Sequence, residues 1–223
     1  MNSSLSWLIF PVNSRQNNTI PNNHFLRKDL YMEFRDVIYS RRSVRKYTSE
    51  PVSDEDLHYI IDCGLQAPSG VNFQPCYFVA VRSEEKMRQL LEVMAGSSDK
   101  LVDNLTERFK KYPEIAKESL AFIRMLGGAP VVILAFRHKP SYTKTDDTIL
   151  QSVSAALENI ALAATDRGLG VCWMTAPIET ADDTRLGELF APGHGKLVAV
   201  MTVGHPAITP APVKRKEGRY IIV

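Results

Sequence analysis

The chain has few cysteines, and their spacing excludes two common uses of this residue. Three occur among 223 residues, the number is odd, and no Cys-x-x-Cys pair is present. Neither a disulfide framework nor a zinc site is therefore expected. We expect free, buried thiols in a reducing compartment, the cytoplasm. The three residues are Cys63, Cys76 and Cys172.

Long apolar runs, a strong charge of one sign and metal-ligand spacings are also missing. The longest apolar stretches, such as residues 130–136, are far shorter than the roughly 20 residues that cross a membrane. The net charge is +2, and the short basic runs lack interleaved aromatic residues, which argues against nucleic-acid binding. The five histidines show no ligand spacing such as HExxH. We therefore predict no membrane span, no nucleic-acid partner and no metal site.

The first 31 residues differ in composition and periodicity from the rest of the chain. They contain six Asn and two Pro and show no helical period, so we predict a flexible N-terminal extension over residues 1–31. The remainder, residues 32–223, has the length of a single domain.

Helical and extended patterns alternate along this domain. Ser53 is a good N-cap, and Pro68 ends the helix that follows it. The mixture predicts an α+β fold, with one mainly antiparallel sheet flanked by helices. Trp173 falls in an apolar strand and is predicted to lie in the core. We expect helices at 32–41, 53–67, 83–94, 97–126 (broken near Pro113), 146–167 and 184–190, and strands at 76–81, 131–136, 171–175 and 197–203.

The most informative segment is Ser40–Tyr47, where four cations and two serine hydroxyls follow the first helix. Its arginines keep their charge, and a guanidinium matches a phosphate with two hydrogen bonds. Taken alone, the cluster fits a basic turn exposed to solvent as well as it fits a phosphate-binding site. A second basic run, Lys214-Arg215-Lys216, lies near the C-terminus. A fold that joins the two clusters would make an anion site, and the chain has no glycine-rich phosphate loop as an alternative.

Two further segments, Ala67–Pro75 and Ala176–Thr180, lie between the basic clusters. In this order, the four blocks resemble the FMN-dependent nitroreductase family over roughly residue 32 to the C-terminus. The resemblance implies a three-layer fold and an intertwined homodimer with FMN at the interface.

The resemblance also implies roles for the basic residues. Arg41 would contact the FMN phosphate, Arg42 and Ser43 the phosphate or ribityl chain, and Arg45 the pyrimidine edge of the flavin. A fixed positive charge there stabilises the negative charge of reduced flavin. Lys214 and Lys216 would be the C-terminal phosphate ligands, with the choice among Lys214, Arg215 and Lys216 left open.

Two loops complete the implied site. One would reach the flavin from the partner subunit, although a polar turn explains the same residues; its residues are Pro68, Ser69, Asn72 and Gln74. In the other, Pro177, Ile178 and Glu179 would lie on one flavin face. The backbone N–H of Glu179 or Thr180 would point toward flavin N5, and Thr180 departs from the Gly of many relatives. Glu179 as a cap of the next helix is the alternative.

The implied activity is hydride transfer from NAD(P)H through flavin N5 to nitroaromatic, quinone or similar aromatic acceptors, by a ping-pong mechanism. No nucleophile–base pair stands out, as expected where a cofactor carries the chemistry. The alternatives are a specialised member of the family, a reductive dehalogenase or flavin-degrading enzyme, and a non-catalytic flavin-binding protein. The choice between NADH and NADPH stays open, because no dinucleotide-binding segment reports on the 2′ position.

Overall fold

The computed structural model describes residues 32–138 and 146–223, so the predicted extension at 1–31 lies outside the described residues. Its centre is an antiparallel sheet in the order β1-β2-β4-β3. The strands are β1 (Cys76–Val81), β2 (Val131–Arg137), β3 (Gly170–Met174) and β4 (Lys196–Gly204). The predicted α+β fold with its antiparallel sheet is confirmed, and each strand begins and ends within one residue of its expected bounds.

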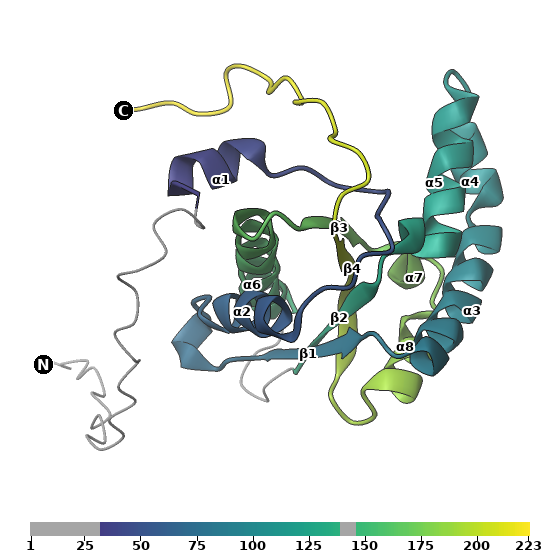
Figure 1. The fold of residues 1–223 in the computed structure, drawn as a ribbon, viewed down its shortest axis with the longest axis horizontal. Coiled ribbons are helices and arrows are strands. Elements are labelled where there is room, and N and C mark those ends of the chain that lie inside the picture. The colour runs from purple at the N-terminus through teal and green to yellow at the C-terminus, as the bar shows by residue number, and fades with distance from the viewer. Residues whose placement is uncertain (1–31, 139–145) are drawn as a thin grey trace, which may run out of the picture. The chain divides into compact units, whose positions relative to one another are not determined.

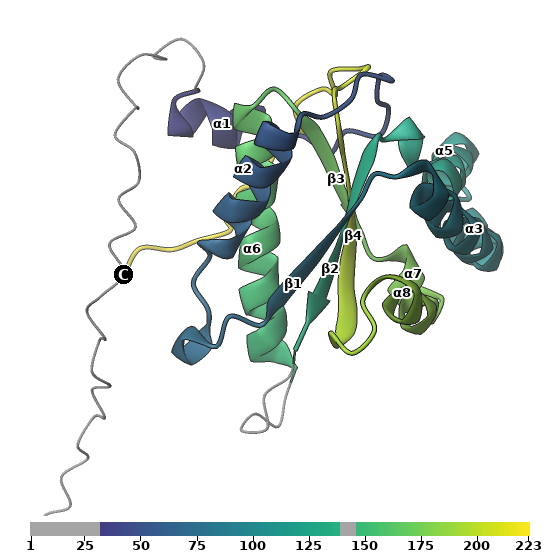
Figure 2. The ribbon, with the colours of Figure 1, turned by 60° about the horizontal axis from the view of Figure 1, so that its bottom comes forward.

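Helices cover both faces of the sheet and give three layers (Figures 1 and 2). Alternate side chains of β2 enter two separate cores, Ile133 on one face and Leu134 on the other. Burial on both faces explains why this strand reads as one continuous apolar run. One outer layer holds α1 (Phe34–Ser40), α2 (Asp54–Leu65) and α6 (Asp147–Asp166); the other holds α3 (Glu84–Lys100), α4 (Val102–Arg108), α5 (Pro113–Met125), α7 (Ala176–Glu179) and α8 (Asp183–Phe190).

The helix ends follow the expected capping in part. Ser53 caps α2 by accepting a hydrogen bond from the Asp56 N–H at 3.0 Å. The expected end of the third helix at residue 94 is wrong, because α3 continues to Lys100. The sequence pattern predicts Ser97 and Ser98 at the start of the next helix, but both lie within α3, where they are buried.

Trp173 does not lie in the core as predicted. Its side chain is 36% exposed, because β3 is an edge strand of the sheet. Within the described ranges, no helix combines the length and the hydropathy that a membrane span requires.

Candidate functional site

The basic segment Arg41–Tyr47, here called the basic strap, runs beside the start of β3. The Val44 N–H donates to the Val171 carbonyl at 2.8 Å, and the Tyr47 N–H donates to the Gly127 carbonyl at 3.1 Å. Both side chains are buried, and the Tyr47 hydroxyl lies 2.6 Å from Thr202 Oγ1. Burial raises the pKa of Tyr47, so the hydroxyl keeps its proton. The strap is therefore anchored by Val44 and Tyr47, which leaves Arg45 and Lys46 exposed and the other two cations half-buried.

The arginines of the strap have donors to spare for a ligand. Arg41 is half-buried and its Nε lies 3.4 Å from Glu158 Oε1 on α6. Arg42 donates through Nη1 to the carbonyls of Tyr39 (2.8 Å) and Arg41 (2.7 Å). Its Nε is buried and has no hydrogen-bond partner among the described residues. A buried donor without an acceptor costs about 1–3 kcal/mol, so an anion that reaches this atom would be stabilised.

A cavity of about 780 Å³ opens beside the strap. Ser43 and Arg45 form one wall, and Arg45 lies 5.9 Å from the centre of the Phe122 ring. Other parts of the wall come from Phe109, which follows α4, from α5 and from Gly127 after it, and the segment after β4 contributes the rest. Two aromatic rings, two cations and one carboxylate suit a flat, polar-edged ligand. The lining residues are Ser43, Arg45, Lys46, Phe109, Ile115, Glu118, Ser119, Ala121, Phe122, Gly127, Ile208 and Pro210.

The predicted loop at residues 176–180 is a short helix, α7. Pro177 is buried, whereas Ile178 and Glu179 are exposed. The Glu179 N–H donates to the Thr175 carbonyl at 3.3 Å, and the Thr180 N–H to the Ala176 carbonyl at 3.2 Å. The Glu179 carboxylate accepts from Thr175 Oγ1 at 3.4 Å, and no side chain caps α8. Glu179 therefore does not serve as the cap of that helix.

The polar turn after Pro68 lies far from the strap of the same chain. Ser69 Oγ accepts from the Gln74 N–H at 2.9 Å, and Gln74 Nε2 donates to Asn72 Oδ1 at 3.1 Å. Residues 71, 72 and 74 are left-handed, a conformation that tight turns use. The turn precedes β1, at the opposite edge of the sheet from β3 and at the opposite end of its strands. Strand spacings of about 4.8 Å and rises of about 3.3 Å per residue separate the two places by more than about 25 Å.

The C-terminal basic run does not meet the strap either. The chain leaves β4 alongside the strap, where the Ala207 N–H donates to the Lys46 carbonyl at 3.0 Å. It then continues as an extended segment (Figure 1). Lys214 and Lys216 are exposed there, and in the described part of the chain no hydrogen bond or ion pair joins either of them to the strap.

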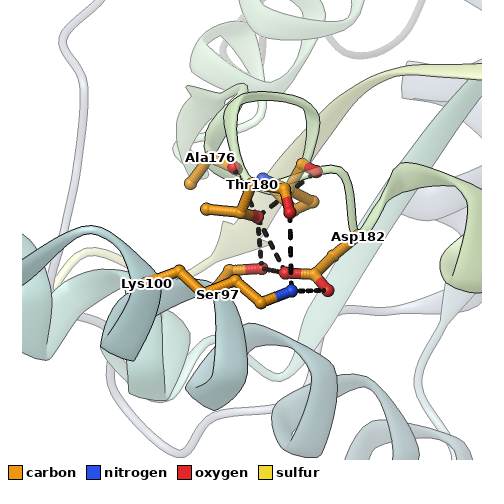
Figure 3. Close-up of polar contacts among 6 residues, drawn as sticks. Ser97, Lys100, Ala176, Thr180 and Asp182 are labelled. Atoms are coloured by element: carbon orange, nitrogen blue, oxygen red, sulfur yellow. Dashed lines mark hydrogen bonds and ion pairs between the residues drawn. The ribbon is translucent and has the colours of Figure 1, made fainter.

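A polar cluster next to α7 was missed in the sequence (Figure 3). Asp182 accepts from Ser97 Oγ (2.7 Å) and Thr180 Oγ1 (2.7 Å), and pairs with Lys100 Nζ at 2.6 Å. Burial alone would raise the pKa of Asp182, but the hydrogen bonds from Lys100, Ser97 and Thr180 outweigh it and hold the pKa below its ordinary value. In the sequence, Ser97 could have indicated this cluster, because it is a small polar residue on the buried face of a helix.

Comparison with known proteins gives three kinds of similarity. A model of the Nitroreductase family matches residues 38–205. A protein of Archaeoglobus fulgidus, provisionally named NADH dehydrogenase/NAD(P)H nitroreductase, is 29% identical over 171 residues, which cover 76% of this chain and 83% of that protein.

Two solved structures carry the third kind of similarity. A provisionally named nitroreductase from Desulfovibrio desulfuricans, in complex with FMN, is 27% identical with a TM-score of 0.64; the match covers 86% of this chain and 96% of that one. An iodotyrosine deiodinase bound to FMN and 3-iodo-L-tyrosine is also 27% identical, with a TM-score of 0.69 over 86% of this chain and 97% of that one.

Proposed function

The chain belongs to the nitroreductase family, and we propose that it is an FMN-dependent oxidoreductase that uses NAD(P)H to reduce nitroaromatic, quinone or similar flat acceptors in a ping-pong cycle. One observation carries the proposal: Ser43 and Arg45 line the cavity, and their neighbour Arg42 keeps a buried Nε that has no hydrogen-bond partner among the described residues. These features fit a ligand that combines a flat ring with a phosphate. The FMN-bound relative of similar fold supports the same ligand.

The residues of the strap and Glu179 have roles that their surroundings allow. Arg41, Arg42 and Ser43 would hold the phosphate, because their free donors satisfy an anion at little further cost. Arg45, exposed beside the cavity, would keep a fixed positive charge at the pyrimidine edge. Bound FMN would supply a ring that takes hydride from NAD(P)H and gives it to the acceptor. The Glu179 N–H, which makes only a long bond of 3.3 Å within α7, would donate to N5.

We further propose a homodimer with the site at its interface. The Ser69–Gln74 turn lies more than about 25 Å from the strap of its own chain, so a second copy would have to bring that turn to the ligand. Several apolar side chains are also exposed to solvent. Phe34 is 71% exposed and Tyr39 is 69% exposed, and the last residues, Tyr220–Val223, are almost fully exposed. A partner that covers these side chains, and offers Lys214 and Lys216 a phosphate, completes the proposed site.

The first test is the absorption spectrum of the purified protein, with mass identification of what heat releases. Bound FMN that NADPH or NADH bleaches without oxygen supports the proposal and names the donor. A protein that stays colourless in excess FMN contradicts it, and bound FMN that no nicotinamide reduces would favour a non-catalytic flavin-binding protein. The elution volume on a calibrated sizing column reports the dimer separately.

Arg41→Ala tests the phosphate site directly. Loss of one charge-assisted hydrogen bond, worth about 1.5–3 kcal/mol, should raise the Kd for FMN at least about tenfold. Arg185→Ala is the matched control, because Arg185 carries the same charge and is exposed on α8, on the other face of the sheet from α1. Equal Kd values in the two variants would remove Arg41 from the site.

Reductive dehalogenation is a second candidate function. The cavity contains Glu118 beside Arg45 and Lys46, so it offers both charge signs that an amino-acid substrate needs, and a deiodinase shares the fold. Iodide release from 3-iodotyrosine by the reduced protein, with slow turnover of quinones, would select this candidate. Fast quinone reduction without iodide release would select the first.

A further inference from the structure

Helix α7 is too short to hold its own position. It has four residues, whereas isolated helices shorter than about 12 residues are marginal in water. Its end is instead fixed by Thr180. The hydroxyl of Thr180 lies 3.1 Å from the Ala176 carbonyl, 2.7 Å from Asp182 Oδ2 and 3.1 Å from Ser97 Oγ. One side chain thus joins α7 to the following turn and to α3.

The network around Thr180 (Figure 3) runs from a buried serine to the Lys100 side chain, which is 53% exposed. Ser97 is fully buried, and the Asp182 side chain is 13% exposed. Asp182 Oδ2 accepts from two hydroxyls, while Lys100 Nζ binds Oδ1 at 2.6 Å and the Thr180 carbonyl at 3.4 Å. Both α3 side chains of the network, Ser97 and Lys100, therefore bond to the segment that follows α7. Charge-assisted bonds of this kind are short and strongly directional.

Helix α3 also bonds to the helix that lines the cavity. Ser98, next to Ser97, donates to the Leu120 carbonyl of α5 at 3.0 Å. Ser119 and Phe122 of α5 line the cavity. Two neighbouring serines of α3 thus fix α7 on one side and the cavity wall on the other.

We propose that Thr180, Asp182, Ser97 and Lys100 form a positioning clamp that sets the Glu179 N–H relative to the cavity and thereby controls the rate of hydride transfer at N5. The inference rests on the proposed function for the identity of the N5 site. None of the four side chains needs to touch FMN. Thr180 gains a role because its hydroxyl lies within hydrogen-bonding distance of the Ala176 carbonyl, Ser97 Oγ and Asp182 Oδ2.

The test compares Thr180→Val, Thr180→Ser and Thr165→Val. Val keeps the shape of Thr but removes the hydroxyl, whereas Ser keeps the hydroxyl. Thr165 is the matched control, because its hydroxyl donates to the Ala161 carbonyl at 2.9 Å on α6, away from the clamp. We expect Thr180→Val to speed amide hydrogen exchange in residues 176–182 about tenfold and to slow flavin reduction by NAD(P)H about tenfold. The Kd for FMN should change less than about twofold, which separates positioning from general damage.

Thr180→Ser should restore both exchange and reduction, and Thr165→Val should alter neither. If Thr180→Val instead leaves exchange and reduction unchanged, or lowers FMN affinity and reduction together, the clamp is wrong. Should Thr180→Val fail to fold, Ser97→Ala removes one donor from the same carboxylate and has the same expected outcome. If the wild-type protein binds no FMN, the proposed function fails, while amide exchange in the FMN-free protein still tests the clamp itself.

Discussion

Gly127→Ala should move the basic strap without altering any of its residues. Gly127 has φ +64°, and a Cβ built on it would lie 2.3 Å from the Arg45 carbonyl oxygen. Carbon and oxygen atoms at this distance overlap, so the Arg45 backbone has to retreat. Gly128 is the control, because its φ is +73° and a Cβ there would meet nothing within 4 Å.

The magnitude follows from the difference between these two glycines. Each Ala pays about 1–2 kcal/mol for a left-handed backbone. Gly127→Ala adds an overpacking cost of about 1–3 kcal/mol. We therefore expect a gap of about 2 kcal/mol between the variants, which is about 4–8 °C in Tm for a chain of this size. The displaced Arg45 should also weaken FMN binding about tenfold, because a charged hydrogen bond is worth about 1.5–3 kcal/mol.

Thermal unfolding followed by circular dichroism measures the first effect, and quenching of FMN fluorescence measures the second. The two variants share composition and a left-handed backbone, so they differ in the crowding of the Arg45 backbone and, at 3.2 Å, of the Phe122 ring. Equal Tm values within about 1 °C, together with equal Kd values, would falsify the claim that Gly127 sets the position of the strap.

Two other outcomes are expected. The pKa of Asp182 is lowered in the folded state, so its contribution to stability is present at neutral pH and is lost as pH falls below about 4. Thermal unfolding from pH 3 to 7 should therefore find Asp182→Asn less stable than wild type at pH 7, and the difference in Tm should shrink in acid. A difference in Tm that stays constant with pH contradicts this. Tyr47→Phe should cost about 1–3 kcal/mol in urea unfolding, because the buried Val44 carbonyl and the Thr202 hydroxyl lose a partner at 2.6 Å. Tyr112→Phe, at a side chain that is 64% exposed, should cost nothing measurable, and similar costs for both variants would refute the role of the Tyr47 hydroxyl.

Local signals predicted most of the fold. Ser53 was recognised as a cap from its own residue type, and the cap is confirmed. The failures have tertiary causes. Ser97 and Ser98 look like loop residues by composition, yet both find buried partners inside α3. Pro177 was read as part of a loop, but proline is tolerated in the first turn of a helix, where α7 carries it.

The candidate site was only partly predictable for a related reason. Charge and residue order singled out Arg41–Arg45 without indicating what holds them. Val44 and Gly127 do so, through a buried side chain and a close backbone approach that no local pattern records. The exposure of Trp173 was missed in the same way, because an apolar strand at the edge of a sheet looks like one at its centre.

The basic strap and the Ser69–Gln74 turn lie far apart in one chain, so one chain alone does not form the whole proposed site. The strap borders β3, and the Ser69–Gln74 turn precedes β1, at the other edge and end of the sheet. Neither bends toward the other, because each is fixed by its own hydrogen bonds. A ligand in the cavity therefore meets the turn only through another molecule. In the proposed homodimer the exposed side chains of α1, Trp173 and the C-terminal segment would become buried. The exposed apolar side chains and the distance between the strap and the turn would then have the same physical cause, the missing partner subunit.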